Sequence, residues 1–239
     1  MEPRYYLRLC TFEVATPLGR RQRLGSFMDG RVVDLNFATA WYMAETGEPD
    51  PQSMADALVP STLAGYLRAG LRAVFTAEEL FLGAGPPPAH WWRWDSPPMG
   101  PNGETLVYPR ENVSILGLFG AEENKLRPGD CEWELAAVMD ARRTLAGYTL
   151  FLRNGSVTRV GPYLITPAEI GDPTRLDWTA RINGQEVARG KIGSVLKPDP
   201  TLDPGEMVRS GPLGGSTLKP GDMLELEAER IGALRAAAA

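Results

Sequence analysis

The sequence contains one histidine and two cysteines, and this scarcity excludes several classes of chemistry. A Ser-His-Asp triad, a Cys-His pair or a multi-histidine metal site would each have to use His90. His90 stands in a proline-rich stretch, residues 85–92, where we interpret it as a linker histidine beside packing aromatics. Cys10 and Cys131 make neither a disulfide framework nor a thiolate cluster, which predicts a reduced, cytoplasmic protein.

Basic charge and long apolar runs are also scarce. The chain of 239 residues has 25 Lys and Arg against 30 Asp and Glu, a net charge of −5. Nucleic-acid binding requires a basic surface, so no nucleic-acid partner is expected. No apolar run approaches the length of a membrane span, and the N-terminal segment alternates in polarity, unlike a signal peptide. We therefore expect no membrane partner.

Residues 1–83 are predicted to form a small α+β domain. Strand-like segments flank Asp29-Gly30, which is a strong hairpin signal. Asn36 is the expected N-cap of the first helix. Helices are expected over residues 37–45, 53–58 and 61–69 (closed by Gly70), and after a capping box formed by Thr76 and Glu79.

Residues 84–104 are rich in Pro, Gly and Trp and are predicted to be a linker. Trp91, Trp92 and Trp94 need a surface to cover, so packing is the expected role. An aromatic cage for a cationic ligand is the alternative.

Residues 105–235 are predicted to form a β-rich domain. Asn183-Gly184 marks a second hairpin. Strands are expected over residues 134–139 and 145–152, and over residues 224–229, where apolar residues alternate with glutamates.

Several segments of this domain, in order, resemble the fumarylacetoacetate hydrolase superfamily. Residues 132–139 (Glu-Trp-Glu-Leu-Ala-Ala-Val-Met) are similar to its Glu-x-Glu-Leu-Ala-x-Val strand. The Gly-Tyr-Thr of residues 147–149 and the Gly-Pro-Tyr-Leu-Ile-Thr-Pro-Ala-Glu-Ile of residues 161–170 resemble the segments that follow it. Two segments that begin with a Pro-Gly turn, at residues 201–206 and 218–232, look like its two closing turn-strand units.

The resemblance implies an α+β fold: a mixed β-roll or β-sandwich of the family's C-terminal type with a small α+β N-terminal domain, usually as a homodimer. It implies Mg²⁺- or Mn²⁺-dependent hydrolysis, decarboxylation or tautomerisation of small oxo acids. By the same resemblance, Glu132 and Glu134 would hold the cation together with an Asp on a following strand.

The Glu-x-Glu spacing has a physical reason. Strand side chains repeat every two residues, so Glu132 and Glu134 project on one face. Two adjacent carboxylates repel each other unless a cation or an arginine lies between them. A hard divalent ion would prefer these oxygen ligands. The alternative is an ordinary solvated face.

The sequence departs from the family pattern around the expected pocket. Arg153, or Gly155 after a small insertion, stands where the family has its third carboxylate, and Arg153 could pair with the two glutamates and displace the metal. The family's lysine-bearing loop and covering helix are shortened. No histidine follows Gly117, so Glu122 or Glu123 could serve as base, or both could be surface acids.

Three functions stay open at this point. The chain could be a metal-dependent enzyme on a small oxo acid. It could use Arg153 with Glu132 and Glu134 for metal-free isomerisation, cyclisation or decarboxylation of a specialised metabolite. It could be a catalytically silent scaffold, or the inactive partner of an active paralogue in a heteromer. We predict a divergent member with impaired or absent metal dependence, which if active is a hydrolase, lyase or isomerase; the alternative is the silent scaffold.

Overall fold

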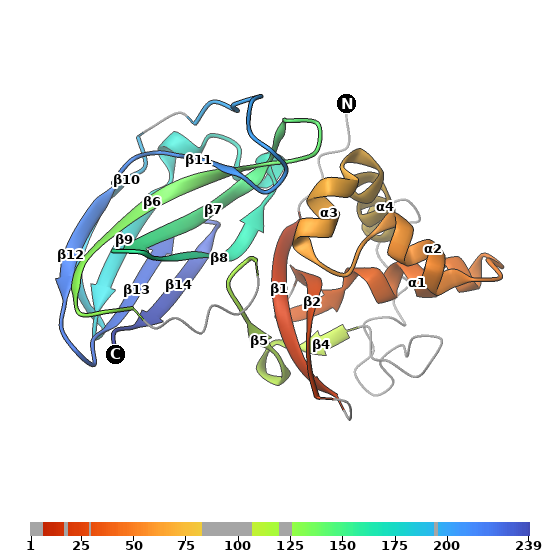
Figure 1. Cartoon of the computed structure of the whole chain (residues 1–239), viewed down its shortest axis with the longest axis horizontal. Coiled ribbons are helices and arrows are strands. Elements are labelled where there is room, and N and C mark those ends of the chain that lie inside the picture. Colours follow the sequence, from red (N-terminus) through yellow and green to blue (C-terminus); the bar gives the residue numbers. More distant parts are fainter. Residues whose placement is uncertain (1–6, 17–18, 29, 83–106, 120–125, 194–195) are drawn as a thin grey trace. The chain divides into compact units, whose positions relative to one another are not determined.

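The computed structural model describes residues 7–16, 19–28, 30–82, 107–119, 126–193 and 196–239 (Figure 1). The chain divides into two compact units, Met1–Ile115 and Leu116–Ala239. This division falls later than residue 105, because the strands that follow the expected linker pair with strands of the first unit. Residues 83–106 lie outside the described ranges, so the domain boundaries at 83 and 104 stay a prediction.

The first unit consists of an antiparallel sheet with helices inserted between its third and fourth strands. The sheet order is β5-β1-β2-β3-β4. Its strands are β1 (Arg8–Thr16), β2 (Gly19–Met28), β3 (Arg31–Asp34), β4 (Val107–Pro109) and β5 (Ser114–Ile115), with a 3₁₀ helix at Arg110–Asn112. Its helices are α1 (Leu35–Glu45), α2 (Pro51–Leu58), α3 (Leu63–Ala69) and α4 (Leu71–Leu82).

The hairpin predicted at Asp29-Gly30 is confirmed, because Met28 of β2 pairs with Arg31 of β3. Two residues thus separate the strands. Gly30 has φ 75°, a conformation that glycine adopts without steric cost.

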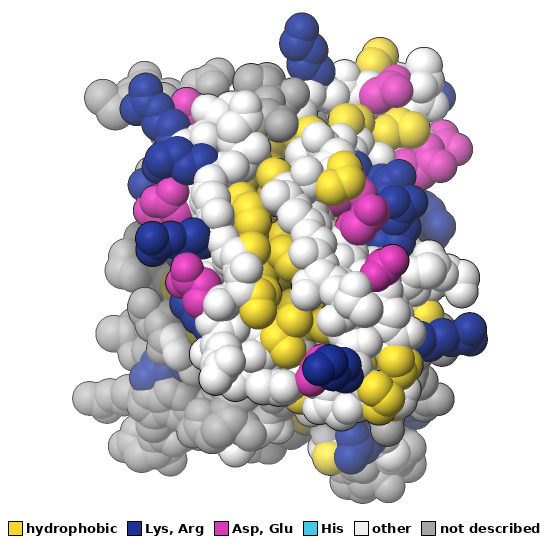
Figure 2. Space-filling view, turned by 90° about the vertical axis from the view of Figure 1, so that its left-hand side faces the viewer, with side chains coloured by type: hydrophobic (Ala, Val, Ile, Leu, Met, Phe, Trp, Pro, Cys, Tyr) yellow, Lys and Arg dark blue, Asp and Glu magenta, His cyan; other side chains and the backbone are white. Residues whose placement is uncertain are grey.

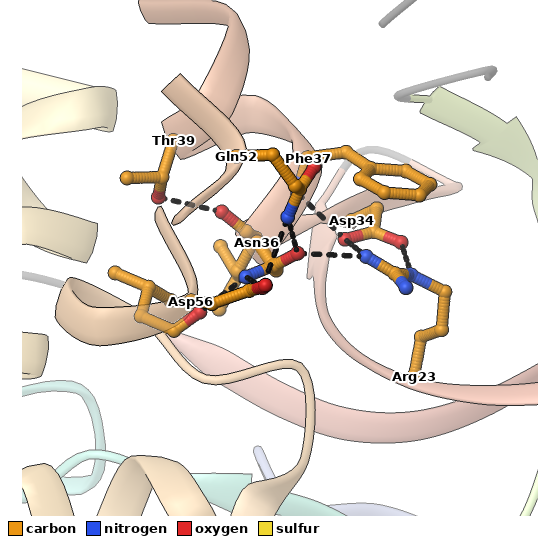
Figure 3. A network of polar contacts seen from close by, with 9 residues as sticks. Arg23, Asp34, Asn36, Phe37, Thr39, Gln52 and Asp56 are labelled. Carbon is orange, nitrogen blue, oxygen red and sulfur yellow. Dashed lines mark hydrogen bonds and ion pairs between the residues drawn. The ribbon is translucent and has the colours of Figure 1, made fainter. Parts of the chain in front are cut away.

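The prediction that Asn36 caps the first helix is wrong. Helix α1 begins at Leu35, and Asp34 is the N-cap: its Oδ1 accepts a hydrogen bond from the Phe37 amide at 3.0 Å (Figure 3). Asn36 lies inside the first turn, where it is buried and donates to the carbonyl of Val59 at 2.8 Å. Both residues are good caps by type, and the end of β3 decided between them.

The predicted capping box at Thr76 is also wrong. Helix α4 starts at Leu71, directly after Gly70, which caps α3 with φ 62°. Thr76 therefore lies in the middle of the helix, where its Oγ1 donates to the carbonyl of Arg72 at 2.8 Å. A hydroxyl bonded to the carbonyl four residues earlier is a common arrangement in helix interiors.

The second unit is a sandwich of two sheets. The first sheet orders β6-β7-β8, with β11 and β12 pairing with different halves of β6 on its free edge. The second sheet orders β10-β9-β13-β14. The strands are β6 (Gly129–Met139), β7 (Leu145–Asn154), β8 (Val157–Ile165), β9 (Asp177–Ile182), β10 (Gln185–Lys191), β11 (Met207–Arg209), β12 (Gly214–Leu218), β13 (Met223–Ala228) and β14 (Gly232–Ala237), with α5 (Pro167–Ile170) and a 3₁₀ helix at Pro173–Arg175 between β8 and β9.

The core of the sandwich is formed by alternate residues of both sheets. On β6 these are Cys131, Trp133, Leu135 and Ala137, which pack with residues of β7, β9, β13 and β14. Trp133 meets Trp178 of β9 edge-on, with ring centroids 6.1 Å apart. Figure 2 views the molecule from the side of β10 and β12, and hydrophobic side chains form a narrow band there between charged ones. Two packed sheets seen at their edge give this pattern.

The hairpin predicted at Asn183-Gly184 is confirmed, and it joins β9 to β10. Both residues have positive φ, 54° and 80°, as a type I′ turn requires. The alternation predicted for residues 224–229 is confirmed as well, because Leu224, Leu226 and Ala228 are buried in β13.

The observed α+β architecture agrees with the predicted fold class. Among the described helices, none combines the length and the apolar character that crossing a membrane requires.

Candidate functional site

The candidate site lies on the face of β6 that points away from the sandwich core. Cys131, Trp133 and Leu135 belong to the core, so Glu132 and Glu134 project from the opposite face. In the register of the sheet, Arg153 of β7 stands opposite Glu132, and Phe151 stands opposite Glu134. The local pattern therefore places the two carboxylates side by side on one face, as the sequence predicts.

Arg153 forms an ion pair with Glu132, from its Nη2 to Oε2. Both side chains are half-exposed, at 45% and 42%. The hydrogen bond to Glu132 raises the pKa of the Arg153 guanidinium, with the negative charge of Glu132 acting in the same direction. A permanent cation thus neutralises the first glutamate.

Glu134 is paired with a second arginine, Arg209 of β11. Its carboxylate is buried, with the residue 3% exposed, and its Oε1 lies 3.3 Å from Nη1 of Arg209. The guanidinium carbon of Arg209 also lies 5.0 Å from the ring centroid of Phe151. Each glutamate of the pair therefore has its own arginine, supplied by the strands on either side of β6.

Arg209 could not be identified as a partner of Glu134 from the sequence. It is separated from Glu134 by 75 residues, and β11 is a strand of only three residues. The only local signal is that Met207–Arg209 follows a Pro-Gly turn and is thus placed to begin a strand.

The polar side chains next to these ion pairs, Asp130 and Asn154, also have hydrogen-bond partners. Asp130, one step before Glu132 on the same face, accepts a hydrogen bond from Thr217 of β12 at 2.7 Å. Asn154, beside Arg153, donates to the carbonyl of Asp130 and accepts from the amide of Arg127. Asn154 is thereby fixed as a structural residue.

This arrangement does not fit Mg²⁺ or Mn²⁺. Hard divalent cations need several oxygen ligands, and a guanidinium beside each carboxylate opposes a further positive charge by repulsion. Within the described parts of the chain, no three His, Cys, Asp or Glu side chains gather as potential ligands.

Among the described residues, Cys131 lies next to Glu132 in the sequence but offers no nucleophile to this face. Burial raises the pKa of the Cys131 thiol to about 12, and the charge of Glu132 adds to the effect, so the thiol stays protonated and faces the core. Glu122 and Glu123, the predicted alternative bases, lie outside the described residues, as do His90 and the linker tryptophans.

No family model matches the chain. It is 32% identical over 145 residues to an uncharacterized protein of Archaeoglobus fulgidus, covering 44% of this chain and 57% of that protein. It is 33% identical over 95 residues to a 2,4-didehydro-3-deoxy-L-rhamnonate hydrolase of Sphingomonas sp., covering 32% of this chain and 33% of that one. It is 31% identical over 90 residues to a maleylpyruvate hydrolase of Aquipseudomonas alcaligenes, covering 33% and 31%. The matched region thus spans less than two thirds of each relative.

Solved structures match nearly the whole chain. Maleylpyruvate hydrolase from Sphingobium sp. SYK-6 superposes with a TM-score of 0.62 at 17% identity, covering 97% of this chain and 98% of that one. The same hydrolase in complex with manganese(II) and pyruvate gives 0.59 at 18% identity, with the same coverage. Fumarylacetoacetate hydrolase from Exiguobacterium antarcticum gives 0.59 at 14% identity, covering 97% and 99%.

At these identities the solved structures establish the fold, and the curated relatives add sequence similarity to two hydrolases over about a third of the chain. The predicted resemblance is thereby confirmed. The chain has the fold seen in maleylpyruvate hydrolase and fumarylacetoacetate hydrolase, as the resemblance implies.

Proposed function

We propose that this protein acts on a small oxo acid or a related specialised metabolite at the Glu132/Glu134 face, without a divalent cation. The observation that carries the proposal is that each glutamate is paired with an arginine. The names of two relatives, both hydrolases, and the pyruvate bound by a structural neighbour support the substrate class. An arginine provides fixed positive charge for a carboxylate or an enolate, which gives such a face a use without metal.

The chemistry that suits this face is proton transfer next to a carbonyl. A glutamate takes a proton from the carbon beside the keto group, the C–H electron pair forms the new C=C bond, and the carbonyl oxygen becomes an enolate oxygen stabilised by a guanidinium. Return of the proton to another atom completes an isomerisation. Glu132, Glu134 and Arg153 are the residues proposed for these steps. Glu122 or Glu123 is retained as a proposed additional base.

Metal binding provides the first test. Calorimetric titration with Mn²⁺ or Mg²⁺ should give binding weaker than about millimolar, because two arginines oppose the cation. Arg153→Asp should strengthen Mn²⁺ binding by about tenfold or more, since it removes a positive charge and adds a third carboxylate. Arg153→Ala serves as the matched variant that removes the cation without adding a ligand.

Micromolar Mn²⁺ binding by the wild-type protein that disappears in Glu132→Ala would contradict metal independence. The substrate class is tested separately, by following enolisation and decarboxylation of oxaloacetate and of acylpyruvates in the presence of EDTA. Turnover above the buffer rate is the expected result, and Glu134→Gln should abolish it.

A catalytically silent scaffold, or an inactive partner of an active paralogue in a heteromer, is the second candidate. The specific observation in its favour is that the same ion pairs leave both glutamates already satisfied. If the wild-type protein turns over these acids no faster than buffer, with or without Mn²⁺, the silent role replaces the enzymatic one. A cytoplasmic location is retained as a proposal for either role.

A further inference from the structure

Three residues form a row across the strands beside Glu134. Arg209 of β11 stands opposite Ala136 of β6, and Ala136 stands opposite Thr149 of β7. All three project on the glutamate face, because Tyr148 and Leu150, the neighbours of Thr149, belong to the sandwich core. The central residue carries only a methyl group, so this row places a guanidinium and a hydroxyl on either side of a small side chain.

Thr149 is the unusual member of the row. The residue is 0% exposed, and among the described residues its Oγ1 has no hydrogen-bond partner. Buried polar groups are nearly always paired, because an unpaired one costs free energy, so an exception suggests a missing partner. The ladder between β7 and β8 is also interrupted here, with a register shift between Tyr148 and Leu150. Such irregularities often lie beside binding sites.

Arg209 has N–H groups that are available to a ligand. A guanidinium carries five N–H groups, and within the described part of the chain Glu134 is its one hydrogen-bond acceptor, at 3.3 Å. The side chain is 41% exposed, and its position against the Phe151 ring restricts its orientation. It is therefore a preoriented cation with an accessible, planar set of donors.

We propose that Arg209 and Thr149 together bind a carboxylate group of the ligand, with Arg209 as the principal determinant of specificity. The planar fork of arginine matches the two oxygens of a carboxylate, and a hydroxyl adds a third donor to one of them. Glu134 stands beside this subsite, where it can face the carbon next to the bound carboxylate. This inference rests on the proposed function, because it names the part of the substrate that the same face recognises.

The test uses oxalate, a dicarboxylate that is not turned over, and its neutral diamide oxamide. Calorimetry should show binding of oxalate but not of oxamide to the wild-type protein. Arg209→Met should weaken oxalate binding by about 100-fold, since it removes the cation and leaves an apolar stem over Phe151. Thr149→Val, which has nearly the same shape and lacks the hydroxyl, should weaken it by about tenfold. Thr179→Val, on the outer face of the other sheet, is the control and should leave the affinity unchanged.

Thermal unfolding separates binding from a structural role. Thr149→Val should unfold at the same temperature as the wild type or higher, because an unpaired hydroxyl is removed from a buried position. Unchanged oxalate affinity in Thr149→Val and Arg209→Met would overturn the subsite. Turnover of oxaloacetate by a wild-type protein that binds no oxalate would also overturn the subsite, but not the proposed function. If the wild type neither binds oxalate nor turns over oxaloacetate, both the subsite and the proposed function are overturned.

Discussion

Asp34 has several polar partners around its buried carboxylate, which is 0% exposed (Figure 3). It accepts hydrogen bonds from the Phe37 amide and from Arg23, whose Nη2 lies 3.2 Å from Oδ1. Nη2 of Arg23 also donates to Asn36 at 3.0 Å, and the guanidinium lies 3.6 Å from the ring centroid of Phe37. One arginine thus ties the β2–β3 hairpin to the first turn of α1.

Replacing Arg23 with Met should destabilise the protein by about 3–5 kcal/mol, because it leaves Asp34 as a buried carboxylate without its counter-charge. Urea unfolding at pH 7 measures the difference. Arg20→Met on the same strand is the matched control. Arg20 pairs with Glu13 on the surface, so its loss should cost less than about 1 kcal/mol.

The loss of stability in Arg23→Met should also depend on pH. Burial raises the pKa of the Asp34 carboxyl, and Arg23 opposes this effect by lowering it. Without Arg23 the raised pKa favours the protonated acid in the folded state, so the contribution of Asp34 to stability is most favourable at low pH and is lost as the pH rises through the folded pKa. The deficit of Arg23→Met against the wild type should therefore shrink toward pH 4. A deficit that is equal at pH 7 and pH 4 would contradict this account.

At the scale of elements, the outer face of the second sheet carries a ladder of charges. Glu225 of β13 stands opposite Arg181 of β9 on one side and Arg235 of β14 on the other. It forms ion pairs with both, at 3.0 Å to Arg181. Glu227 of the same strand has Arg181 as its one ion-pair partner within the described part of the chain, at 2.7 Å. Oppositely charged neighbours on adjacent strands stabilise their pairing.

Glu225→Gln should lower the free energy of unfolding by about 1 kcal/mol at pH 7. The hydrogen bond from Arg235, together with that from Arg181, lowers the pKa of the Glu225 carboxyl. A lowered folded-state pKa contributes stability above the unfolded value of about 4.3, and this contribution is lost as the pH falls through the folded pKa. The difference between wild type and variant should thus vanish in acid.

Glu227→Gln is the comparison for this measurement. Glu227 has one arginine partner and its side chain is 50% exposed, so its loss should cost about half as much or less. Equal effects of the two substitutions would mean that Glu225 gains nothing from its second partner.

Elements that are set by a few neighbouring residues could be predicted from the sequence, and elements that depend on packing could not. The Asp29-Gly30 and Asn183-Gly184 hairpins followed from two-residue turn chemistry, and both were confirmed. The start of α1 and of α4 did not follow, because Asp34 and Asn36 are equally suitable caps and Thr76 fits a capping box or a helix interior. Packing selected between alternatives that local chemistry left equal.

At the scale of the whole molecule, a homodimer stays a prediction. Light scattering after gel filtration should give a mass of about twice the 26.1 kDa of the chain. A single-chain mass across micromolar concentrations would contradict it. A mass of one chain that doubles on adding an active paralogue would instead support the heteromer.

Part of the candidate site could be predicted from the sequence, and part of it could not. The placement of Glu132, Glu134 and Arg153 on one face followed from the two-residue repeat of strands and the order of β6 and β7. The roles of Arg209 and of the buried Thr149 hydroxyl could not be predicted. Arg209 lies 75 residues after Glu134 in the sequence, and the pairing of β7 with β8 is irregular at Thr149.

The sequence by itself determined the resemblance to the superfamily, the hairpins and the side of the strand on which the glutamates lie, because these depend on residue type and short spacing. Only the tertiary structure decided that each glutamate has its own arginine. The pairing of β11 with β6 depends on the path of the intervening loop and on edge-strand register, which no local pattern encodes. That pairing adds Arg209 to Arg153, so both carboxylates on this face have an arginine partner.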